Sequence, residues 1–365
     1  MNLLLFNLKT DADADTQGFT TRWIAAIARD PRVNQVLVLT MYAGRIDVPE
    51  NVRVFSVGRE EGYSEFRRLF RFYRLLFRIL RENRIDACFS HMTPIFSVLA
   101  GPVFRIAGIP LVTWFAHPSL TWKLRVAHRL STRMVTSVPT AYPYRHDKLT
   151  VIGQGIDAKL FSPAADGETV PPMILCVGRL SPIKGHAVLL NAAEDLRQRV
   201  DGQWRVVILG NIPEAREHQE YAADIVERIG RPPLLGLVDI ADPIPNHSLP
   251  ELYRRCAVHV NLTPSGSGDK VALEAMACGR PSVVCNEGFR ETLGIYAERL
   301  LFEQGNPTDL AEKLEWCLSL PREQRQEIGA YLRERVIELH GLDRLANQLV
   351  QLLRELAEPR GEGGK

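Results

Sequence analysis

Short apolar runs alternate with helical patterns along most of this chain, and the alternation constrains its fold more than any other feature. A first block has strand patterns at 3–7, 35–39, 52–56, 87–90, 111–115 and 134–137, and helical patterns at 19–28, 63–84, 95–106 and 120–131. A second block has strand patterns at 173–177, 205–209, 258–262 and 282–285, and helical patterns at 187–199, 215–229, 249–254 and 270–277. Strands that alternate with helices predict parallel sheets covered on both faces, so we expect an α/β fold.

The region between the two blocks, residues 149–172, is rich in Gly, Pro and Asp, which is typical of a linker. A length of 365 residues is sufficient for two domains, each with its own core. We expect an N-terminal domain at 1–163 and a C-terminal domain at 164–340. A helix at 341–358 is expected to pack back toward the N-terminal domain, and 359–365 to be a disordered tail.

The overall composition is that of a globular protein. Hydrophobic residues make up 45% and charged residues 24%, which excludes disordered and fibrous classes. The six cysteines include no CxxC pair, so we expect reduced thiols and neither a zinc site nor a disulfide framework. The first residues lack the basic region of a signal peptide, and no run reaches the roughly 18 apolar residues of a membrane span. These features predict a cytoplasmic chain.

The N-terminal half is basic. Residues 1–163 contain 22 Lys and Arg against 13 Asp and Glu, a net charge of +9, and the remainder carries −7. Much of the excess lies in 65–84, where arginines recur at spacings of four and three and share one helical face: Arg67, Arg71, Arg74, Arg78 and Arg81. Arginines interspersed with Phe, Tyr and Leu are typical of an interfacial helix on an anionic membrane. An ordinary amphipathic helix with a solvated face is the alternative, and no motif for nucleic-acid binding accompanies the charge.

Two glycine-containing loops of the second block carry the candidate chemistry. The first, GRLSPIKGH at 178–186, presents Arg179 and Lys184 on a turn before a helix, where a guanidinium fork and an ammonium can close on a diphosphate. Two solvated cations on a turn are the alternative. The second loop leads directly into a helix that contains Glu274, one turn inside. Helix-terminal and glycine amides form an anion site, and Glu274 can accept a hydrogen bond from a ribose hydroxyl. The loop residues are Gly266, Ser267, Gly268, Asp269 and Lys270.

These two segments, followed by the strand at Val283–Cys285, resemble the donor-binding domain of the retaining family-4 glycosyltransferases (glycosyl transferases group 1). Val151–Asp157 with Phe161 and Pro163 is similar to the hinge signature of that family, and Gly108–His117 is similar to its N-domain strand that ends in a histidine. The resemblance extends over nearly the whole chain. It implies the GT-B fold, in which two Rossmann-like, doubly wound domains face each other across a cleft and a C-terminal helix crosses over.

The resemblance implies roles for individual residues. Arg179 and Lys184 would bind the diphosphate and, with His117, form the catalytic set; His117 would contact the donor sugar, although a buried structural histidine is the alternative. Glu274 would hold the ribose, and Gly18 and Gly178 would let the backbone approach the phosphates. Together with the 266–270 loop these residues form the expected donor site. We expect nucleobase recognition in the loop 239–248, and the residues that we single out there are Asp239, Pro243, Ile244 and Pro245.

One departure from the family concerns the sugar. The family carries two glutamates eight residues apart, but the position eight before Glu274 is Gly266, so the first glutamate is missing. Asp269 could reach the sugar hydroxyls from the same turn. Asp11, Asp13 and Asp15 imitate a metal-binding DxD motif, but they follow the first strand, and we interpret them as an acidic loop on the acceptor side.

The resulting expectation is a retaining glycosyltransferase that uses a UDP- or GDP-linked sugar without a divalent metal or a cofactor. Its acceptor would be lipid-linked or a polysaccharide, at the cytoplasmic face of the membrane. Two alternatives stay open. One is a non-catalytic subunit that binds nucleotide sugar. The other is a related epimerase or phosphorylase, although neither the acid/base carboxylates of the former nor the cofactor lysine of the latter is evident.

Overall fold

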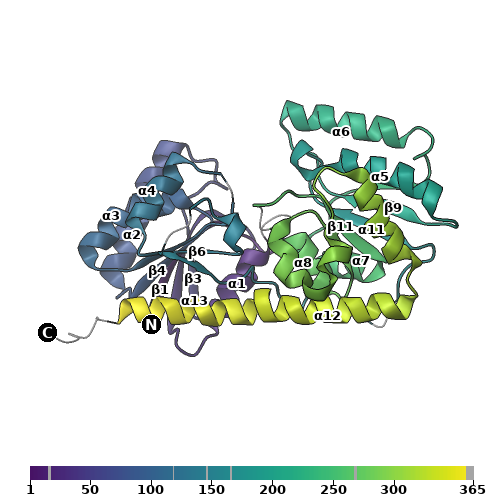
Figure 1. The fold of residues 1–365 in the computed structure, drawn as a ribbon. Coiled ribbons are helices and arrows are strands. Elements are labelled where there is room, and N and C mark those ends of the chain that lie inside the picture. Colours follow the sequence, from purple (N-terminus) through teal and green to yellow (C-terminus); the bar gives the residue numbers. More distant parts are fainter. Residues whose placement is uncertain (15–17, 118, 145–146, 165–166, 267–268, 359–365) are drawn as a thin grey trace. The chain divides into compact units, whose positions relative to one another are not determined.

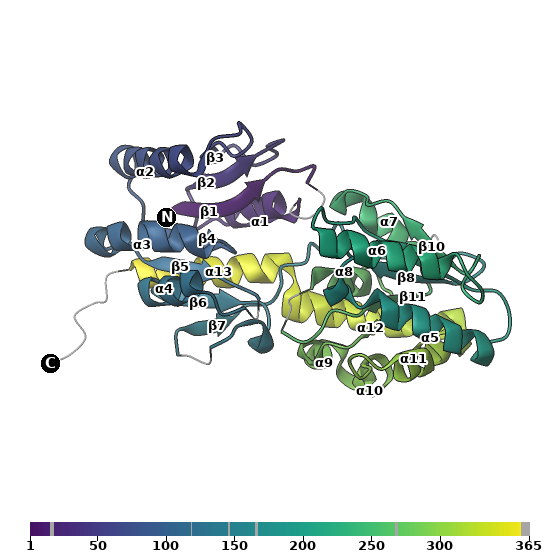
Figure 2. The same ribbon diagram turned by 90° about the horizontal axis from the view of Figure 1, so that it is seen from above.

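The computed structural model of the protein describes residues 1–14, 18–117, 119–144, 147–164, 167–266 and 269–358. The chain divides into two compact units, which are coloured along the sequence in Figures 1 and 2. The first unit is Met1–Gly155 with the segment that begins at Leu342, and the second is Ile156–Gly341. Each unit contains one sheet of parallel strands with helices on both faces, which confirms the predicted α/β class.

The sheet of the first unit has seven strands in the order β3-β2-β1-β4-β5-β6-β7. Its strands are β1 (Asn2–Thr10), β2 (Gln35–Ala43), β3 (Val52–Ser56), β4 (Ala87–His91), β5 (Leu111–Trp114), β6 (Arg133–Thr136) and β7 (Leu149–Val151). Successive side chains of β1 enter different cores. Leu3 and Leu5 belong to one cluster, and Leu4 and Phe6 to another, because a strand points alternate side chains to opposite faces.

Two layers of helices cover these faces. The helices α2 (Glu65–Glu82), α3 (Pro94–Ala107) and α4 (Trp122–Leu130) lie on one side, and α1 (Phe19–Ala28) and α13 (Leu342–Ala357) lie on the other (Figures 1 and 2). The last helix packs into the first unit through its apolar stripe. Leu345, Leu349 and Leu353 are fully buried in the same cluster as Trp23 of α1.

The sheet of the second unit has five strands in the order β10-β9-β8-β11-β12. Its strands are β8 (Met173–Val177), β9 (Arg205–Leu209), β10 (Val238–Ala241), β11 (Val258–Asn261) and β12 (Ser282–Val284). In one group of helices α5 (His186–Arg199) contacts α6 (Arg216–Ile229) and α11 (Pro307–Ser319). In the other, α8 (Lys270–Ala277) contacts α7 (Leu249–Arg255) and α12 (Arg322–His340). Two short helices, α9 (Arg290–Leu293) and α10 (Ala297–Leu300), follow β12.

Residues 156–163, which we expected at the end of the N-terminal domain, belong to the second unit. The Ile156 amide donates to the His340 carbonyl at the end of α12 at 2.7 Å, and Phe161 is buried in the second unit's core. The Arg333 guanidinium of α12 donates to the carbonyls of Ala158 and Phe161 at 2.9 and 2.7 Å. The chain therefore enters the second unit after Gly155, ahead of the expected boundary.

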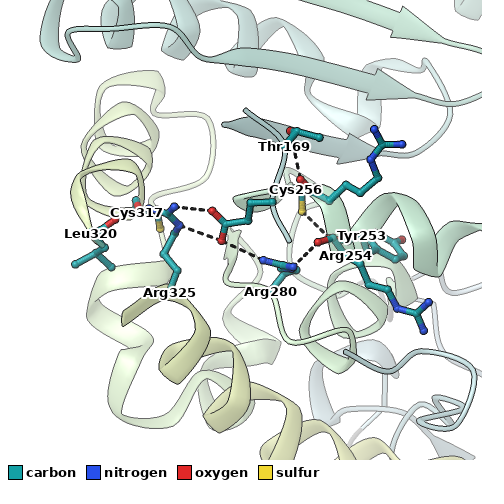
Figure 3. Close-up of polar contacts among 10 residues, drawn as sticks. Thr169, Tyr253, Arg254, Cys256, Arg280, Cys317, Leu320 and Arg325 are labelled. Atoms are coloured by element: carbon teal, nitrogen blue, oxygen red, sulfur yellow. Dashed lines mark hydrogen bonds and ion pairs between the residues drawn. The ribbon is translucent and has the colours of Figure 1, made fainter. Parts of the chain in front are cut away.

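A buried ion triad fixes the segment that precedes β8 to the rest of the second unit (Figure 3). Glu168, which precedes β8, binds Arg280 at 3.0 Å and Arg325 of α12 at 2.5 Å, and each of the three side chains is less than a tenth exposed. Arg280 also donates to the Arg254 carbonyl at the end of α7, and Arg325 to the Leu320 carbonyl. The network therefore joins four separate segments of the second unit.

Candidate functional site

The topology of the second sheet singles out one position for a ligand. From β8 the chain moves to β9 on one side, whereas β11 lies on the other side of β8. Ligands of open parallel sheets bind outside the strand carboxyl ends at such a switch in strand order. The loops that leave β8 and β11 are 178–185 and 262–269, and these are the two loops that the sequence predicts to bind the donor.

The loop after β8 passes very close to a neighbouring segment. A Cβ atom built on Gly210, just after β9, would lie 1.9 Å from the Gly178 carbonyl oxygen, so only glycine fits at 210. Gly185 adopts the left-handed conformation (φ +64°) that ends the loop and starts α5. Between Gly178 and Gly185, Arg179 is exposed and makes no ion pair or hydrogen bond with any residue that the structure describes. Its guanidinium is therefore available to a ligand.

Lys184 joins the two loops. Its ammonium lies 2.5 Å from Asp269 Oδ2 and donates to the Thr263 hydroxyl at 2.9 Å. Asn261 and Thr263, at the end of β11 and just after it, also donate to Asp269 Oδ2, at 2.9 and 2.6 Å. All of these donors share one carboxylate oxygen. A lysine has three N–H donors, so Lys184 retains one for a ligand after bonding Asp269 and Thr263.

Asp269 is ionised in this environment. Burial would raise the pKa of its carboxyl, but the charge of Lys184 and the hydrogen bonds from Lys184, Thr263 and Asn261 outweigh burial and lower the pKa to about 2. The neighbouring His186 is neutral near pH 7, because burial and the charge of Lys184 lower its pKa to about 4. The positive charge at the loop after β8 therefore comes from Arg179 and Lys184.

Glu274 lies on α8 and is 3% exposed. The Asn246 amide donates to its Oε1 at 3.2 Å, and the Tyr253 hydroxyl of α7 donates to its Oε2 at 3.3 Å. Burial, and then the charge of Glu274, raise the pKa of Tyr253 well above its ordinary value, so the hydroxyl stays a donor. Sequence reasoning did not identify Asn246 or Tyr253, since both lie far from Glu274 along the chain.

The remaining predicted residues of this loop differ in what the structure describes. Gly266 is buried and has φ +91°, a conformation that L-residues rarely adopt. Lys270 is the first residue of α8 and is half-buried. Ser267 and Gly268 lie outside the described residues. The backbone at Gly266 therefore has a conformation that a glutamate would rarely adopt.

The predicted nucleobase loop is in part a strand. Asp239 lies in β10 and is exposed, because β10 is the edge strand of the sheet and pairs only with β9. Pro243 is exposed, and Ile244 and Pro245 are half-buried in the connection that follows. The loop itself therefore begins after Ala241 rather than at 239.

Two predicted site residues belong to the first unit. Gly18 is buried at the start of α1, and a Cβ there would lie 2.7 Å from the Ala14 carbonyl oxygen, so its own loop already requires glycine. His117 follows β5 and is exposed, and its Nδ1 accepts a hydrogen bond from the Ser119 amide at 3.1 Å. The alternative of a buried structural histidine is therefore wrong.

The acidic loop after β1 is described in part. Arg45 binds the Asp13 carboxylate through two hydrogen bonds of 2.8 Å, and Asp11 accepts from the Arg45 amide at 3.1 Å. Asp15 lies outside the described residues. These bonds give Asp11 and Asp13 a role in shaping the loop itself.

The five arginines predicted to face a membrane do not form one uniform face. Arg71 is half-buried and pairs with Glu61 at 3.3 Å, Arg78 pairs with Glu82 at 3.0 Å, and Arg67 lies over the Tyr63 ring. Within the part of the chain that the structure describes, Arg74 and Arg81 are exposed and have no partner. No helix among the described residues is both long enough and apolar enough to cross a bilayer.

The outward face of α2 is aromatic. The exposed fractions of Phe66, Phe70 and Phe77 are 87%, 72% and 54%. In a helix of 3.6 residues per turn these three positions fall within about 40° of one another, and Arg74 and Arg81 lie immediately beside them. The opposite face of α2 packs into the first unit, and its buried side chains are Phe72, Leu75, Leu76 and Ile79.

Comparison with known proteins relates this geometry to a family. Residues 161–335 match the family model described as glycosyl transferases group 1. A D-inositol 3-phosphate glycosyltransferase of Streptosporangium roseum is 28% identical over 208 residues, which are 51% of this chain and 47% of the relative. Another of Paenarthrobacter aurescens is 32% identical over 184 residues, 46% of this chain and 43% of the relative. The chain spans about half the length of the curated relatives that it matches.

Solved structures resemble the whole chain in fold. A sucrose-phosphate synthase of Thermosynechococcus elongatus has a TM-score of 0.77 at 19% identity, with 98% of this chain and 99% of that chain covered. Anabaena HepE in complex with UDP has a TM-score of 0.73 at 18% identity, with 97% and 100% covered. These neighbours confirm the GT-B fold class. Together, the comparisons show that residues 161–335, just under half of the chain, are similar to glycosyl transferases group 1, and that the whole chain shares the fold of these solved structures.

Proposed function

We propose that the protein transfers a sugar from a nucleotide diphosphate donor to a hydroxyl acceptor. One observation carries the proposal: at the switch point of the second sheet, two loops 85 residues apart are joined by Lys184 and Asp269, beside the unpaired guanidinium of Arg179. An ammonium and a guanidinium at strand carboxyl ends suit a diphosphate. The match of residues 161–335 to the group 1 family supports the same activity.

The proposed roles follow from the contacts. Arg179 binds the diphosphate through its free fork, and Lys184 through the donor that Asp269 and Thr263 leave unused. Glu274, oriented by Asn246 and Tyr253, accepts hydrogen bonds from the ribose. Solved structures of Anabaena HepE contain UDP and UDP-glucose, so a UDP-linked sugar is the first donor to test.

We further propose a retaining reaction without a divalent metal. Fixed cations beside the leaving diphosphate stabilise the negative charge that develops as the glycosidic bond breaks. A phosphate oxygen that departs on the face of acceptor attack can take the acceptor proton. His117 is proposed, from the family resemblance, to contact the donor sugar. Determining the anomeric configuration of the product by NMR, with and without a chelator, tests both statements.

The experiment that tests the activity is a thermal-shift screen of UDP- and GDP-linked sugars, followed by a transfer assay. A ligand that binds only the folded state raises the melting temperature. Lys184→Ala alone is ambiguous, since it leaves a buried carboxylate at Asp269 unpaired. The double variant Lys184→Met with Asp269→Asn removes both charges and keeps the volume, and Lys313→Ala, on α11, is the matched control.

We expect donor binding to fall at least tenfold in the double variant and to stay unchanged in the α11 control. A donor-induced shift in the wild type without turnover, even with membrane extract as the acceptor source, would favour the alternative of a non-catalytic nucleotide-sugar-binding subunit. Equal donor binding by the wild type and the double variant would overturn the assignment of the site.

We also propose that the acceptor is lipid-linked or a membrane-proximal glycan, and that α2 lies on the cytoplasmic face of an anionic membrane. Exposed Phe66, Phe70 and Phe77 suit the acyl boundary, and the unpaired Arg74 and Arg81 beside them suit anionic headgroups. Each arginine near such a surface contributes about 1 kcal/mol. This arrangement supports peripheral association through the helix rather than a solvated helical face.

Sedimentation with vesicles tests this surface. Binding to vesicles with 30% phosphatidylglycerol should exceed binding to phosphatidylcholine vesicles, and Phe66→Ser with Phe70→Ser should reduce it at least tenfold. Arg216→Gln, an exposed arginine of α6, is the control. Equal sedimentation of the wild type and the double serine variant would refute the role of α2, whatever the result of the donor assay.

A further inference from the structure

A pocket lies in the first unit, at the opposite edge of the sheet from the strand carboxyl ends. Its volume is about 450 Å³, and its lining includes Leu111, Thr132 and Lys148, which stand at or just before the starts of β5, β6 and β7. Parallel strands begin at a common edge, so the pocket is formed at the amino ends of these three strands. Its volume lies in the range of roughly 300–1,000 Å³ that is typical of small-molecule sites.

Three cations line this pocket. Arg105 comes from the last turn of α3, Arg129 from the last turn of α4, and Lys148 from the segment before β7. Arg105 and Arg129 are exposed and make no ion pair or hydrogen bond with any described residue. The Lys148 ammonium donates to the Ser131 carbonyl at 3.4 Å. Among the described residues that line the pocket, none is an aspartate or a glutamate.

Basic residues in the last turn of a helix also have a purely structural explanation, because they offset the negative end of the helix dipole. Each helix end contributes roughly half of an elementary negative charge. Two helices end at this pocket, so about one negative charge stands against the two guanidinium groups of Arg105 and Arg129, before Lys148 is counted. These two groups alone exceed what the helix ends require by about one positive charge.

The rest of the lining is apolar and shaped by close packing. Phe104, Leu130 and Leu356, the last from α13, form part of the wall. A Cβ at Gly101 would lie 2.7 Å from the Leu130 Cβ, so glycine lets α3 and α4 approach. Gly108, in the left-handed conformation (φ +69°), ends α3 at the pocket's rim. The site thus combines two guanidinium groups and an ammonium with an apolar wall.

We infer that this pocket binds a phosphate group carried by a small ligand. Guanidinium forks match the oxygens of a phosphate in pairs, and an ammonium adds a point charge. Two sources share this chemistry, a free phosphate and the headgroup of a phospholipid whose glycerol lies on the apolar wall. None of the residues proposed for the nucleotide donor or for the α2 surface lines the pocket, so the inference does not depend on either.

The test uses the full-length protein and isothermal titration calorimetry with two probes, inorganic phosphate and a water-soluble short-chain phosphatidic acid. The variant is Arg105→Gln with Arg129→Gln. The matched control is Arg125→Gln, one turn earlier on α4; this arginine is exposed, pairs with no described residue and is not among the described residues that line the pocket. Circular dichroism and a UDP thermal shift show that each variant is folded and that the second unit is intact.

We expect saturable binding of at least one probe, weakened at least tenfold in the double variant and less than twofold in the control. Binding of the lipid at least tenfold tighter than that of inorganic phosphate assigns the pocket to a headgroup, and similar affinities assign it to free phosphate. No saturable binding of either probe, or equal weakening in the control, would overturn the inference. A change in the UDP shift is not expected, so failure here is distinguishable from failure of the proposed transferase site.

Discussion

Asp269 keeps its charge in a nearly buried position because three polar groups donate to its carboxylate: the Lys184 ammonium, the Thr263 hydroxyl and the Asn261 amide. Its carboxyl pKa is about 2, below the ordinary value of 3.8. A lowered pKa in the folded state stabilises the protein above pH 4, and this stabilisation is lost as the pH falls from about 4 through about 2. The shift corresponds to about 2 kcal/mol at pH 7.

The first prediction concerns Asp269→Asn. We expect the variant to lose about 2 kcal/mol of unfolding free energy at pH 7, and the difference from the wild type to shrink between pH 4 and pH 2. Urea unfolding of the wild type and the variant at a series of pH values measures it. Asp195→Asn is the control, because Asp195 forms an exposed pair with Arg199 on α5 and should change stability by less than about 1 kcal/mol. A difference that does not depend on pH would contradict the assigned cause.

The second prediction concerns Gly266, the position at which the resemblance to the family-4 glycosyltransferases leads us to expect a glutamate. Because its φ is +91°, a side chain at this position adds backbone strain of roughly 1–2 kcal/mol. We expect Gly266→Glu to lower the melting temperature of the second unit and to leave any transferase activity no higher than in the wild type. Gly266→Ala should show the same loss of stability. Increased turnover by the glutamate variant would show that the loop can adopt the family's arrangement.

Residue-level chemistry was predictable where it follows local sequence. The spacing of Arg179 and Lys184 on a glycine turn places both at the carboxyl end of β8, as the structure shows. The partners were not predictable, since Tyr253 and Glu274 meet only through packing of α7 on α8. Asn261 and Thr263 alternate at the end of β11, which places both side chains on the same side of the strand. This pattern could have indicated that both contact Asp269, but it was not used in the sequence analysis.

At the scale of elements, most helices with a continuous apolar stripe were predicted, although α11, whose stripe includes the buried Leu310, Leu314 and Cys317, was missed. The helix α12 was not predicted, because its buried face is not continuously apolar. Arg325 and Gly329 lie on it together with Ile328, Leu332 and Val336. A Cβ at Gly329 would lie 2.0 Å from the Gly279 carbonyl oxygen, so glycine is required for α12 to reach α8. The strands β7 and β10 were missed because they have three and four residues and include exposed positions.

The third prediction concerns α13, whose periodic stripe was recognised in the sequence. Leu349 is completely buried against the first unit's core. Truncating a buried leucine loses the free energy gained by moving its methyl groups out of water, and it leaves a cavity. Leu349→Ala should therefore lower the first unit's free energy of unfolding by about 3 kcal/mol. Arg354→Ala, on the exposed face of the same helix, should cost less than about 1 kcal/mol. Hydrogen exchange can localise the change, and faster exchange confined to the second unit would contradict the assignment of α13.

At the scale of the whole molecule, two separate cores explain why the linker was difficult to place. The Gly- and Pro-rich region at 149–172 predicted a boundary, but its composition does not distinguish a free linker from a segment that packs on a unit. In the structure β7 completes the first sheet, and Phe161 enters the second core. The boundary is therefore fixed by long-range contacts that no local pattern encodes.

The fourth prediction concerns Glu168, which fastens the start of the second unit to α12 and to the loop after α8. Replacing it with glutamine leaves Arg280 and Arg325 buried without a counter-charge, and breaking a buried pair in this way costs about 3–5 kcal/mol. Glu298→Gln is the control, because Glu298 is an exposed partner of Arg290 and such pairs contribute at most about 1 kcal/mol. We expect Glu168→Gln to lower the unfolding transition of the second unit and to leave that of the first unit in place. Because each unit has its own core, a parallel fall of both transitions would instead mean that the two units unfold as one cooperative body.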